Sequence, residues 1–454
     1  MLCDILLRGR GSRKYIRCFA LLGILCMVII LLLRRSSSRR NPGGKTVKLI
    51  KDPESYPTQW KYMFNDELLV FSAFSVDART NDPYIRAFGL ISNKFDDLSP
   101  YYCVVNYRQN GKFCPTKRQR LKMQEIDSEN RGWAFFPVSL KCPFARGMDP
   151  VSITIIKDLN DCREKDNLAW VKVTETEART DVKLKDFGLC ILPPEGFESV
   201  GQILEVMELN RILGADLILL YDQAWRKTDQ IVLALQHYLK SGILDIVDWH
   251  LPLDAHDKFH RHGQTVFLND CLYRLKNKVK YVVYTDVDEF LVPLKHSDWP
   301  SMMAYLEPTN KHVASYRVDD LYMLVKDPAD RWRCKDETGI EKLTFESEDV
   351  CPMVLSHTLV LQSKFSYPSH SRCILRPDKV NLVTVDKSIE TIPGFTDKTL
   401  SRDLVVSFHY IDEEEAKWWL GDESLISAKK YMYMFEYKEE LIASIKENLK
   451  HWDT

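Results

Sequence analysis

The sequence predicts an α/β protein in which a β-rich region precedes a parallel, Rossmann-like sheet, with a transmembrane anchor at the N-terminus. From Phe187 onward, short apolar runs alternate with segments of helical spacing, as they do in β-α-β units with parallel strands. Residues 59–181 contain short runs rich in Val, Ile, Phe and Tyr that turn residues separate, which predicts mostly β-structure, resembling a β-sandwich. Residues 18–33 are uncharged and apolar almost throughout, as in a membrane span.

The N-terminal segment predicts a tail, an anchor and a stem. Basic residues flank the apolar segment on both sides, and no small-residue cleavage site follows it, which favours an uncleaved signal anchor over a signal peptide. We expect a cytosolic tail over residues 1–17, the anchor over 18–33 and a flexible stem over 34–58. The expected location is the Golgi membrane, as a single-pass type II protein with the rest of the chain in the lumen.

The composition indicates a folded ectodomain. Of 454 residues, 45% are hydrophobic and 28% are charged, and the net charge of −1 gives no nucleic-acid footprint. The roughly 400 residues after the anchor exceed one core, so we expect a β-rich domain over 59–181 and an α/β domain over 182–454.

The cysteines predict disulfides. Nine of the 12 cysteines follow the anchor, where an oxidising lumen would preserve disulfides, and none has C-x-x-C spacing, so a zinc site is not expected. Because nine is odd, at least one thiol stays reduced or pairs between chains. Cys103 with Cys114, and Cys334 with Cys351, are close enough in sequence for local bridges.

The second half of the chain divides into alternating strands and helices. The strand that begins at Phe187 is stopped by Pro193 and Pro194, and Gly214 closes the first helix as a C-cap. The run that ends at Asp222 is continuously apolar, as expected of a strand that is buried on both faces. We expect strands over 187–192, 216–222, 243–249 and 281–285, and helices over 199–213, 228–239 and 264–276.

Acidic residues follow two of these strands. Asp222 ends one strand, and Asp286 and Asp288 follow another as a D-x-D pair, whose side chains would share a face in strand geometry. In open α/β sheets, ligands bind at the carboxyl ends of the strands. Mg²⁺ and Mn²⁺ prefer carboxylate oxygens, often shared with substrate phosphates. Although a bare D-x-D also occurs by chance in chains of this size, this placement predicts the nucleotide-diphosphate site that a nucleotide-sugar glycosyltransferase needs.

A longer ordered series of motifs resembles glycosyltransferase family 92. The series covers about residues 60–415, and its most specific block is 263–293. It consists of C-x-L-P-P, LNRILGADLILLYD, LQHYLKSGILDIVDW, HGQTVFLNDCLYRLKNKVKYVVYTDVDEFLVP, RCILRPDKV and SFHY. Many family members carry a His soon after the RPDKV block, which this chain lacks, so we expect no ligand there.

The resemblance implies an inverting, metal-dependent enzyme of the GT-A fold. Its implied donor is UDP-galactose, its cofactor Mn²⁺, and its acceptor a terminal β-galactoside on glycoprotein glycans, joined through a β-1,4 linkage. The expected partners are therefore a nucleotide sugar, a glycan acceptor and the membrane, but no nucleic acid. Other UDP-sugars or acceptors, an inactive glycan-binding ectodomain and a receptor-type protein remain alternatives.

The implied reaction assigns donor-binding and metal-binding roles to four residues. Asp288 is expected to bind the metal directly, and Asp286 to bind ribose or metal-bound water. Glu289 either hydrogen-bonds the donor sugar or is solvated beside it. His409 is a candidate third metal ligand, with a buried core histidine as its alternative.

The nucleotide site has further candidates. Tyr221 and Asp222 end a strand at the expected site, and we assign both to cofactor binding. Arg372 and Arg376 could contact pyrophosphate through forked donors or form structural ion pairs; we assign Arg376 to cofactor binding.

Acceptor-side roles are predicted for a second group. An inverting transfer needs a general base, for which Asp319 and Asp320 are the candidates, together with the acidic run 413–415, which could instead be a solvated face. Trp418 and Trp419 could stack on a sugar ring or cap the core, and we expect a core role.

The anchor gives a topology prediction. In sealed microsomes that contain the full-length protein, added protease should spare the bulk of the chain, because everything after residue 33 is expected in the lumen. Detergent should then make the whole chain susceptible. Digestion of the large C-terminal part in intact vesicles would contradict the type II orientation.

Overall fold

The computed structural model describes most of the chain from residue 60 to residue 450. The gaps are 64–66, 77–81, 95–100, 109–110, 114–119, 127–132, 158, 161–167, 177–182, 192–198, 223–228, 250, 252–262, 327–342, 346–347, 362–370 and 385–386. The predicted tail, anchor and stem lie outside the described residues. Within the described part, no helix is long and apolar enough to cross a membrane.

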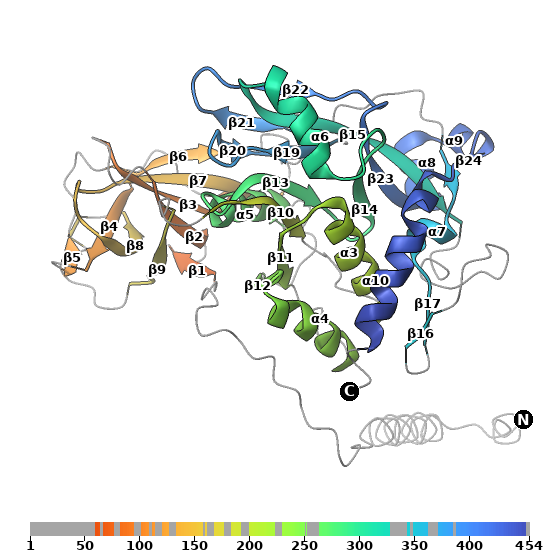
Figure 1. The fold of residues 1–454 in the computed structure, drawn as a ribbon. Helices are drawn as coiled ribbons and strands as arrows, with labels where there is room; N and C mark the ends of the chain where they lie inside the picture. The colour runs from red at the N-terminus through yellow and green to blue at the C-terminus, as the bar shows by residue number, and fades with distance from the viewer. Residues whose placement is uncertain are drawn as a thin grey trace, which may run out of the picture. The chain divides into compact units, whose positions relative to one another are not determined.

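The first sheet confirms a β-rich N-terminal region. In the described part of the chain, nine strands pair in the order β5-β4-β8-β9-β2-β3-β7-β6, with β1 beside β2 (Figure 1). All pairs are antiparallel except β2 with β9. The strands are β1 (Lys61–Met63), β2 (Leu68–Val76), β3 (Tyr84–Ser92), β4 (Tyr102–Tyr107), β5 (Gly111–Phe113), β6 (Lys122–Glu125), β7 (Phe135–Pro143), β8 (Pro150–Ile156) and β9 (Val171–Glu175).

The second sheet confirms the predicted alternation of strands and helices. Its parallel part has the order β12-β11-β10-β13, and antiparallel strands extend it through β19 and β15. The alternating elements are β10 (Lys185–Ile191), α3 (Val200–Leu213), β11 (Leu217–Asp222), α4 (Asp229–Ser241), β12 (Leu244–Asp248), α5 (Gln264–Leu275) and β13 (Val279–Thr285). Each lies within a few residues of its predicted range.

The later elements extend this sheet and cover it. They are β14 (Glu289–Pro293), α6 (Trp299–Leu306), β15 (Val313–Val325), α7 (Met353–Ser356), β18 (Leu359–Val360), β19 (Ser371–Leu375), β20 (Val380–Val383), β21 (Ser388–Thr391), β22 (Thr396–Thr399), β23 (Val405–Asp412), α8 (Glu413–Leu420), α9 (Glu423–Ile426), β24 (Lys429–Lys430) and α10 (Lys438–Lys450). Two short strands, β16 (Leu343–Phe345) and β17 (Glu348–Val350), pair with each other.

The parallel strands are buried on both faces. Along β13, Tyr281 and Val283 join a core with α3, α4, α6 and α10, whereas Val282 and Tyr284 join a core with α5. This second core also contains Phe74 of β2, so the two sheets share one apolar interior. Successive strand residues point to opposite faces, which explains why these strands read as continuous apolar runs.

The helix α3 begins and ends as the sequence predicts. The Ser199 hydroxyl accepts a hydrogen bond from the Gln202 backbone, and Gly214 adopts φ of 114° at the C-terminal end. A Cβ at position 214 would lie 2.5 Å from Cδ of Pro300. Both the backbone conformation and the close approach of α6 therefore require glycine.

A buried carboxylate fastens α10 to the helical layer. Glu208 of α3 accepts hydrogen bonds from the Tyr238 hydroxyl at 2.6 Å and from Asn448 of α10 at 2.8 Å. Arg211 lies 2.7 Å from its other oxygen. Because the charge is paired and hydrogen-bonded, its burial is tolerated.

The disulfides correct one expectation. Cys103 pairs with Cys142 across the first sheet, so the predicted local bridge to Cys114 is wrong; Cys114 itself lies outside the described residues. β4 and β7 bring Cys103 and Cys142 within bonding reach, although they lie 39 residues apart in sequence. Cys351 is disulfide-bonded, and its predicted partner Cys334 lies outside the described residues.

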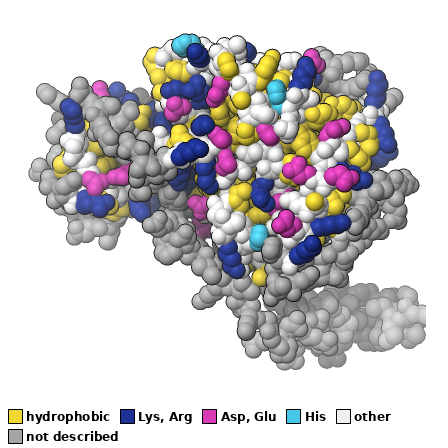
Figure 2. Space-filling view, viewed as in Figure 1, with side chains coloured by type: hydrophobic (Ala, Val, Ile, Leu, Met, Phe, Trp, Pro, Cys, Tyr) yellow, Lys and Arg dark blue, Asp and Glu magenta, His cyan; other side chains and the backbone are white. Residues whose placement is uncertain are grey.

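The described cysteines and the surface charges agree with the cysteine count and the net charge of the sequence. Cys373 is a buried, reduced thiol, as the odd cysteine count allows. On the face that Figure 2 shows, acidic and basic side chains are interspersed, in keeping with the net charge of −1. The predicted division into domains at residue 181 stays a prediction.

Glu205 of α3 gives a stability prediction. Burial raises its pKa to about 8, although hydrogen bonds from the backbones of Val354 and Met353 act in the opposite direction. The folded state therefore holds a proton that the unfolded state loses above about pH 4.5. Between about pH 4.5 and pH 8, this group should lower the free energy of unfolding as pH rises, by up to about 1.4 kcal/mol per pH unit.

Urea unfolding of the full-length protein across this range would test the prediction. Glu205→Gln should remove this part of the slope and gain relative stability toward pH 8, whereas Glu439→Gln, at an exposed site of α10, should follow the wild type. Parallel curves for Glu205→Gln and wild type would contradict the assignment.

Candidate functional site

The D-x-D pair lies in the turn between β13 and β14. β13 ends at Thr285, so the alternation of a strand, which predicted a shared face for Asp286 and Asp288, does not apply. The Asp286 backbone donates to the Glu289 carboxylate at 3.3 Å, and Tyr410 of β23 donates its backbone N–H to the Asp288 carbonyl at 3.0 Å. The turn is therefore held by its own following residue and by the neighbouring strand.

A buried ion pair lies directly beneath this turn. Glu289 is fully buried, and Arg372 of β19 donates through Nε and Nη2 to both of its carboxylate oxygens. Arg372 Nη2 also lies 3.3 Å from Asp286 Oδ2. Burial alone would lower the pKa of Arg372, but the carboxylates of Glu289, Asp320 and Asp286 raise it above its usual range. This forked arrangement fixes the planes of both partners.

His409 of β23 completes one side of the cluster. It stands opposite Glu289 in the antiparallel ladder, with Nδ1 3.1 Å from Glu289 Oε1 and 3.7 Å from Asp320 Oδ2. Burial acts to lower its pKa, but Glu289, Asp320 and Asp288 outweigh burial and raise the pKa to about 9. A metal ion bound to this imidazole would have to displace its proton.

The neighbours Asp319 and Asp320 point to opposite faces of β15. Asp320 is buried beside His409, and neither of its carboxylate oxygens accepts a hydrogen bond from a described residue. Asp319 instead forms an ion pair with Arg402 at 3.0 Å and keeps its side chain 20% exposed. Only one of the two predicted bases therefore joins the cluster, as strand alternation requires.

Three potential ligands of a divalent cation lie close together in the cluster. One ligand atom from each of Glu289, Asp320 and His409 lies within 4.8 Å of the others, and all three residues are buried. The Asp320 oxygens and His409 Nδ1 are buried atoms without a hydrogen-bond partner among the described residues. Carboxylate oxygens and imidazole nitrogen both suit such ions. Glu289 is less available, because Arg372 engages both of its oxygens.

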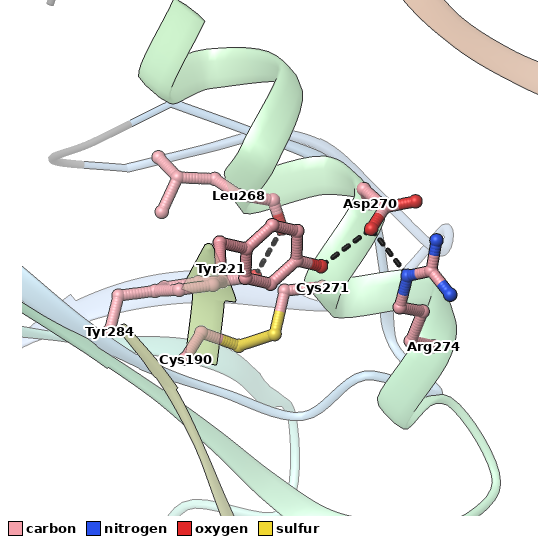
Figure 3. The surroundings of a disulfide bond; sticks show 7 residues. All are labelled: Cys190, Tyr221, Leu268, Asp270, Cys271, Arg274 and Tyr284. Atoms are coloured by element: carbon pink, nitrogen blue, oxygen red, sulfur yellow. Dashed lines mark hydrogen bonds and ion pairs between the residues drawn. A yellow bond between two sulfur atoms is a disulfide. The ribbon is translucent and has the colours of Figure 1, made fainter. Parts of the chain in front are cut away.

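Two predicted nucleotide residues lie two strands away from the D-x-D turn, on β11. Tyr221 is fully buried, and its hydroxyl donates to Asp270 at 2.5 Å beside Arg274 and the Cys190–Cys271 disulfide (Figure 3). Its polar group thus serves the core under α5, which contradicts a ligand role. Asp222 is also buried but lies at the carboxyl edge of the sheet, as predicted.

Arg376 is not brought to the cluster. It follows β19 at the end opposite Arg372, and its Nη1 donates to the Lys311 carbonyl at 3.2 Å. Residues four apart on a strand share a face but are separated by about 13 Å along it. The arginine of the candidate site is therefore Arg372, and the assignment of Arg376 to cofactor binding is not supported by its position.

The segment after β23 forms one wall of the site. Asp412 caps α8, and the Glu415 carboxylate accepts a hydrogen bond from the Asp412 backbone, so the acidic run begins a helix with a capping box. Trp419 meets the His409 ring edge-on at 5.5 Å. Trp418, in contrast, is 83% exposed, which corrects the expectation that both tryptophans cap the core.

Tyr322 is a site residue that the sequence reasoning missed. Its ring lies 5.6 Å from His409 and 6.1 Å from Trp419. Burial, followed by the nearby carboxylates of Asp320 and Glu289, raises its pKa well above the usual range. The signal was present, because Tyr322 lies two residues beyond Asp320 and shares its face of β15.

Comparison with known proteins identifies relatives. Residues 185–450 match the model of glycosyltransferase family 92, which is more than half of the chain. The chain is also 25% identical over 356 residues to the beta-1,4-galactosyltransferase galt-1 of Caenorhabditis elegans, covering 73% of this chain and 79% of that protein.

Two solved structures show weak likenesses. TarS of S. aureus in complex with UDP-GlcNAc aligns with a TM-score of 0.26 and 12% identity, over 58% of this chain and 66% of that chain. The mannosyltransferase PcManGT of Pyrobaculum calidifontis in complex with GDP-Man and Mn²⁺ gives 0.26 and 13%, over 61% and 77%. At these TM-scores, neither likeness bears on the ligands of this chain.

The two arginines provide a matched test of the site geometry. Arg372→Ala should lower the free energy of unfolding by about 3–5 kcal/mol, because it leaves the buried Glu289 carboxylate without its partner. Arg376→Ala should change it by less than about 1 kcal/mol, since that side chain is partly exposed. Urea unfolding at pH 7 would measure both. Equal losses would show that Arg372 is not the partner that the cluster depends on.

Proposed function

This chain belongs to glycosyltransferase family 92, and from that premise we propose that it transfers galactose from UDP-galactose to a terminal β-galactoside of glycoprotein glycans. The proposed reaction inverts the anomeric centre and forms a β-1,4 linkage. The observation that carries the proposal is the buried cluster of Glu289, Arg372, His409 and Asp320 beneath the D-x-D turn, within the matched region. The name of the Caenorhabditis elegans relative supports galactose as the sugar.

The donor would bind across the carboxyl edge of the parallel strands, in the manner of a GT-A fold. Asp222 ends β11 and Asp286 follows β13, and these two strands flank β10. Asp286 is oriented by Arg372, and the same guanidinium is paired with Glu289 in the interior. Polar groups held in this way are suited to orient sugar hydroxyls, because they need no reorganisation when the substrate arrives.

We propose that His409, Asp288 and Asp286 hold a divalent cation, with Mn²⁺ as the expected ion. When bound, the cation would neutralise negative charge on the diphosphate leaving group. Asp288 contributes to the raised pKa of His409, so its charge acts on the imidazole. The Glu289 carboxylate, 3.1 Å from Nδ1, would orient the imidazole, as carboxylates commonly do for metal-binding histidines.

Asp320 is our candidate for the general base. An inverting transfer needs a group that removes the proton from the attacking acceptor hydroxyl. Asp320 has two buried oxygens that accept no hydrogen bond from the described residues, whereas Asp319 is paired with Arg402. Asp320 is therefore the better placed of the two predicted bases.

We further propose residence in the Golgi membrane, with a type II orientation. The support is the uncharged, apolar segment 18–33, which no small-residue cleavage site follows. This location would supply both nucleotide sugars and glycoprotein acceptors to a lumenal enzyme.

A donor screen tests the proposed activity. Full-length protein with Mn²⁺ and a β-galactoside acceptor should transfer sugar from UDP-galactose at least tenfold faster than from UDP-glucose or UDP-N-acetylglucosamine. A site can discriminate this strongly when a buried polar group pairs with the distinguishing hydroxyl, and Glu289 is our candidate. NMR of the product should show a β-1,4 linkage. An α-linkage, or a preference for another UDP-sugar, would overturn the specificity.

The metal is tested in the same assay. EDTA should abolish transfer, and Asp288→Asn should lower it by at least 100-fold while the thermal unfolding temperature changes little, because a neutral amide is a weak ligand for a hard cation. Asp319→Asn is the matched control, since its ion pair with Arg402 lies outside the cluster. Full activity in EDTA would exclude the proposed cation.

A further inference from the structure

Trp418 is an exposed aromatic side chain beside the candidate site. Its side chain is 83% exposed, more than any other large hydrophobic side chain that the structure describes. A single exposed apolar residue is ordinary on a protein surface. Its position indicates a role at the candidate site, because a row of rings connects Trp418 to the buried cluster.

The row of rings is short. The Trp418 ring lies 6.1 Å from Trp419, and Trp419 lies 5.5 Å from His409. His409 in turn contacts Glu289 and Asp320. Two ring-to-ring steps, each comparable to the width of a sugar ring, therefore separate Trp418 from the candidate catalytic groups.

The backbone holds Trp418 in a fixed place. α8 follows β23 directly, and its capping box joins Asp412 to Glu415. Ala416 is fully buried in a small core with Tyr322 and Ile411, which attaches α8 to β15 and β23. An aromatic residue on a rigid element can bind a ring with little loss of conformational entropy.

The location favours the acceptor over the donor. The nucleotide is expected at β10 to β13, whereas α8 packs on β15 and β23, which lie to the right of β10 and β13 in Figure 1. The first turn of α8 carries Glu413 and Glu414, both exposed, which disfavours an anionic ligand there. A neutral sugar with an apolar C–H face matches an exposed indole in this setting.

We propose that Trp418 forms an acceptor subsite that stacks on the second sugar of the glycan, the one that carries the terminal galactoside. This inference rests on the proposed function, which places the terminal sugar at the cluster. The terminal galactose would bind at the cluster, and the next neutral pyranose would lie against the indole face. Trp418 would then make the enzyme prefer acceptors of at least two sugars over a single galactoside.

Two acceptors of different length test the subsite. With lactose as acceptor, Trp418→Ala should raise KM about tenfold, because the second sugar loses its stacking partner. With methyl β-galactoside, which lacks that sugar, the same variant should stay within twofold of wild type. Trp418→Phe should keep part of the lower KM that lactose has relative to methyl β-galactoside. The KM for UDP-galactose should not change.

The controls separate the subsite from folding and from general surface effects. Tyr305→Ala removes another exposed aromatic, on α6, and should leave both acceptor KM values unchanged. Thermal unfolding should match wild type for every variant, since Trp418 is exposed. Equal KM changes for lactose and methyl β-galactoside in Trp418→Ala, or no change for either, would overturn the subsite.

A binding measurement distinguishes this inference from the proposed function. If wild-type protein transfers no galactose, the proposed function fails, but saturation-transfer NMR with lactose still reports on the surface. Contacts to the glucose ring that disappear in Trp418→Ala would support the subsite without any turnover. Absence of those contacts in the wild type would overturn it.

Discussion

The Glu289–Arg372 ion pair is the interaction on which the candidate site depends. A fully buried carboxylate is tolerated when a cation is fixed against it, and Arg372 engages both oxygens of Glu289. Glu289 also positions its neighbours. It accepts a hydrogen bond from the Asp286 backbone, which closes the D-x-D turn, and its Oε1 lies 3.1 Å from His409 Nδ1. One carboxylate thus links the turn after β13, the strand β19 and the strand β23.

Sheet pairing makes this convergence possible. β14 and β23 place Glu289 opposite His409, and β23 and β15 place Tyr322 beside His409. β15 and β19 place Arg372 opposite Val318, two residues before Asp320. Four segments that are distant in sequence therefore deliver one charged or aromatic group each to the same region. A register slip of one residue in any of them would turn its group to the opposite face.

The sequence predicted the elements better than the site. Apolar runs and helix caps are local signals, so β10 to β13 and α3 to α5 were predicted within a few residues. Site geometry depends on long-range pairing. Nothing local distinguishes Arg372 from Arg376, and only the pairing of β19 with β15 shows which one meets Glu289.

The remaining misses have similar causes. Tyr221 ends a strand at the predicted edge, yet its hydroxyl turns toward Asp270 because its face of β11 is covered by α5. The alternation that separates Asp319 from Asp320 was available from sequence, but which of them faced inward was not.

The apolar core shared by the two sheets has a further consequence. Phe74 and Phe88 of the first sheet pack on Tyr273 of α5, with ring centroids 5.3 Å and 5.1 Å apart. The region that matches the family model starts at residue 185 and therefore leaves out these two phenylalanines. An expression clone cut at that boundary would expose this apolar side of α5 to water and would be prone to aggregate, so an expressed protein should include both sheets.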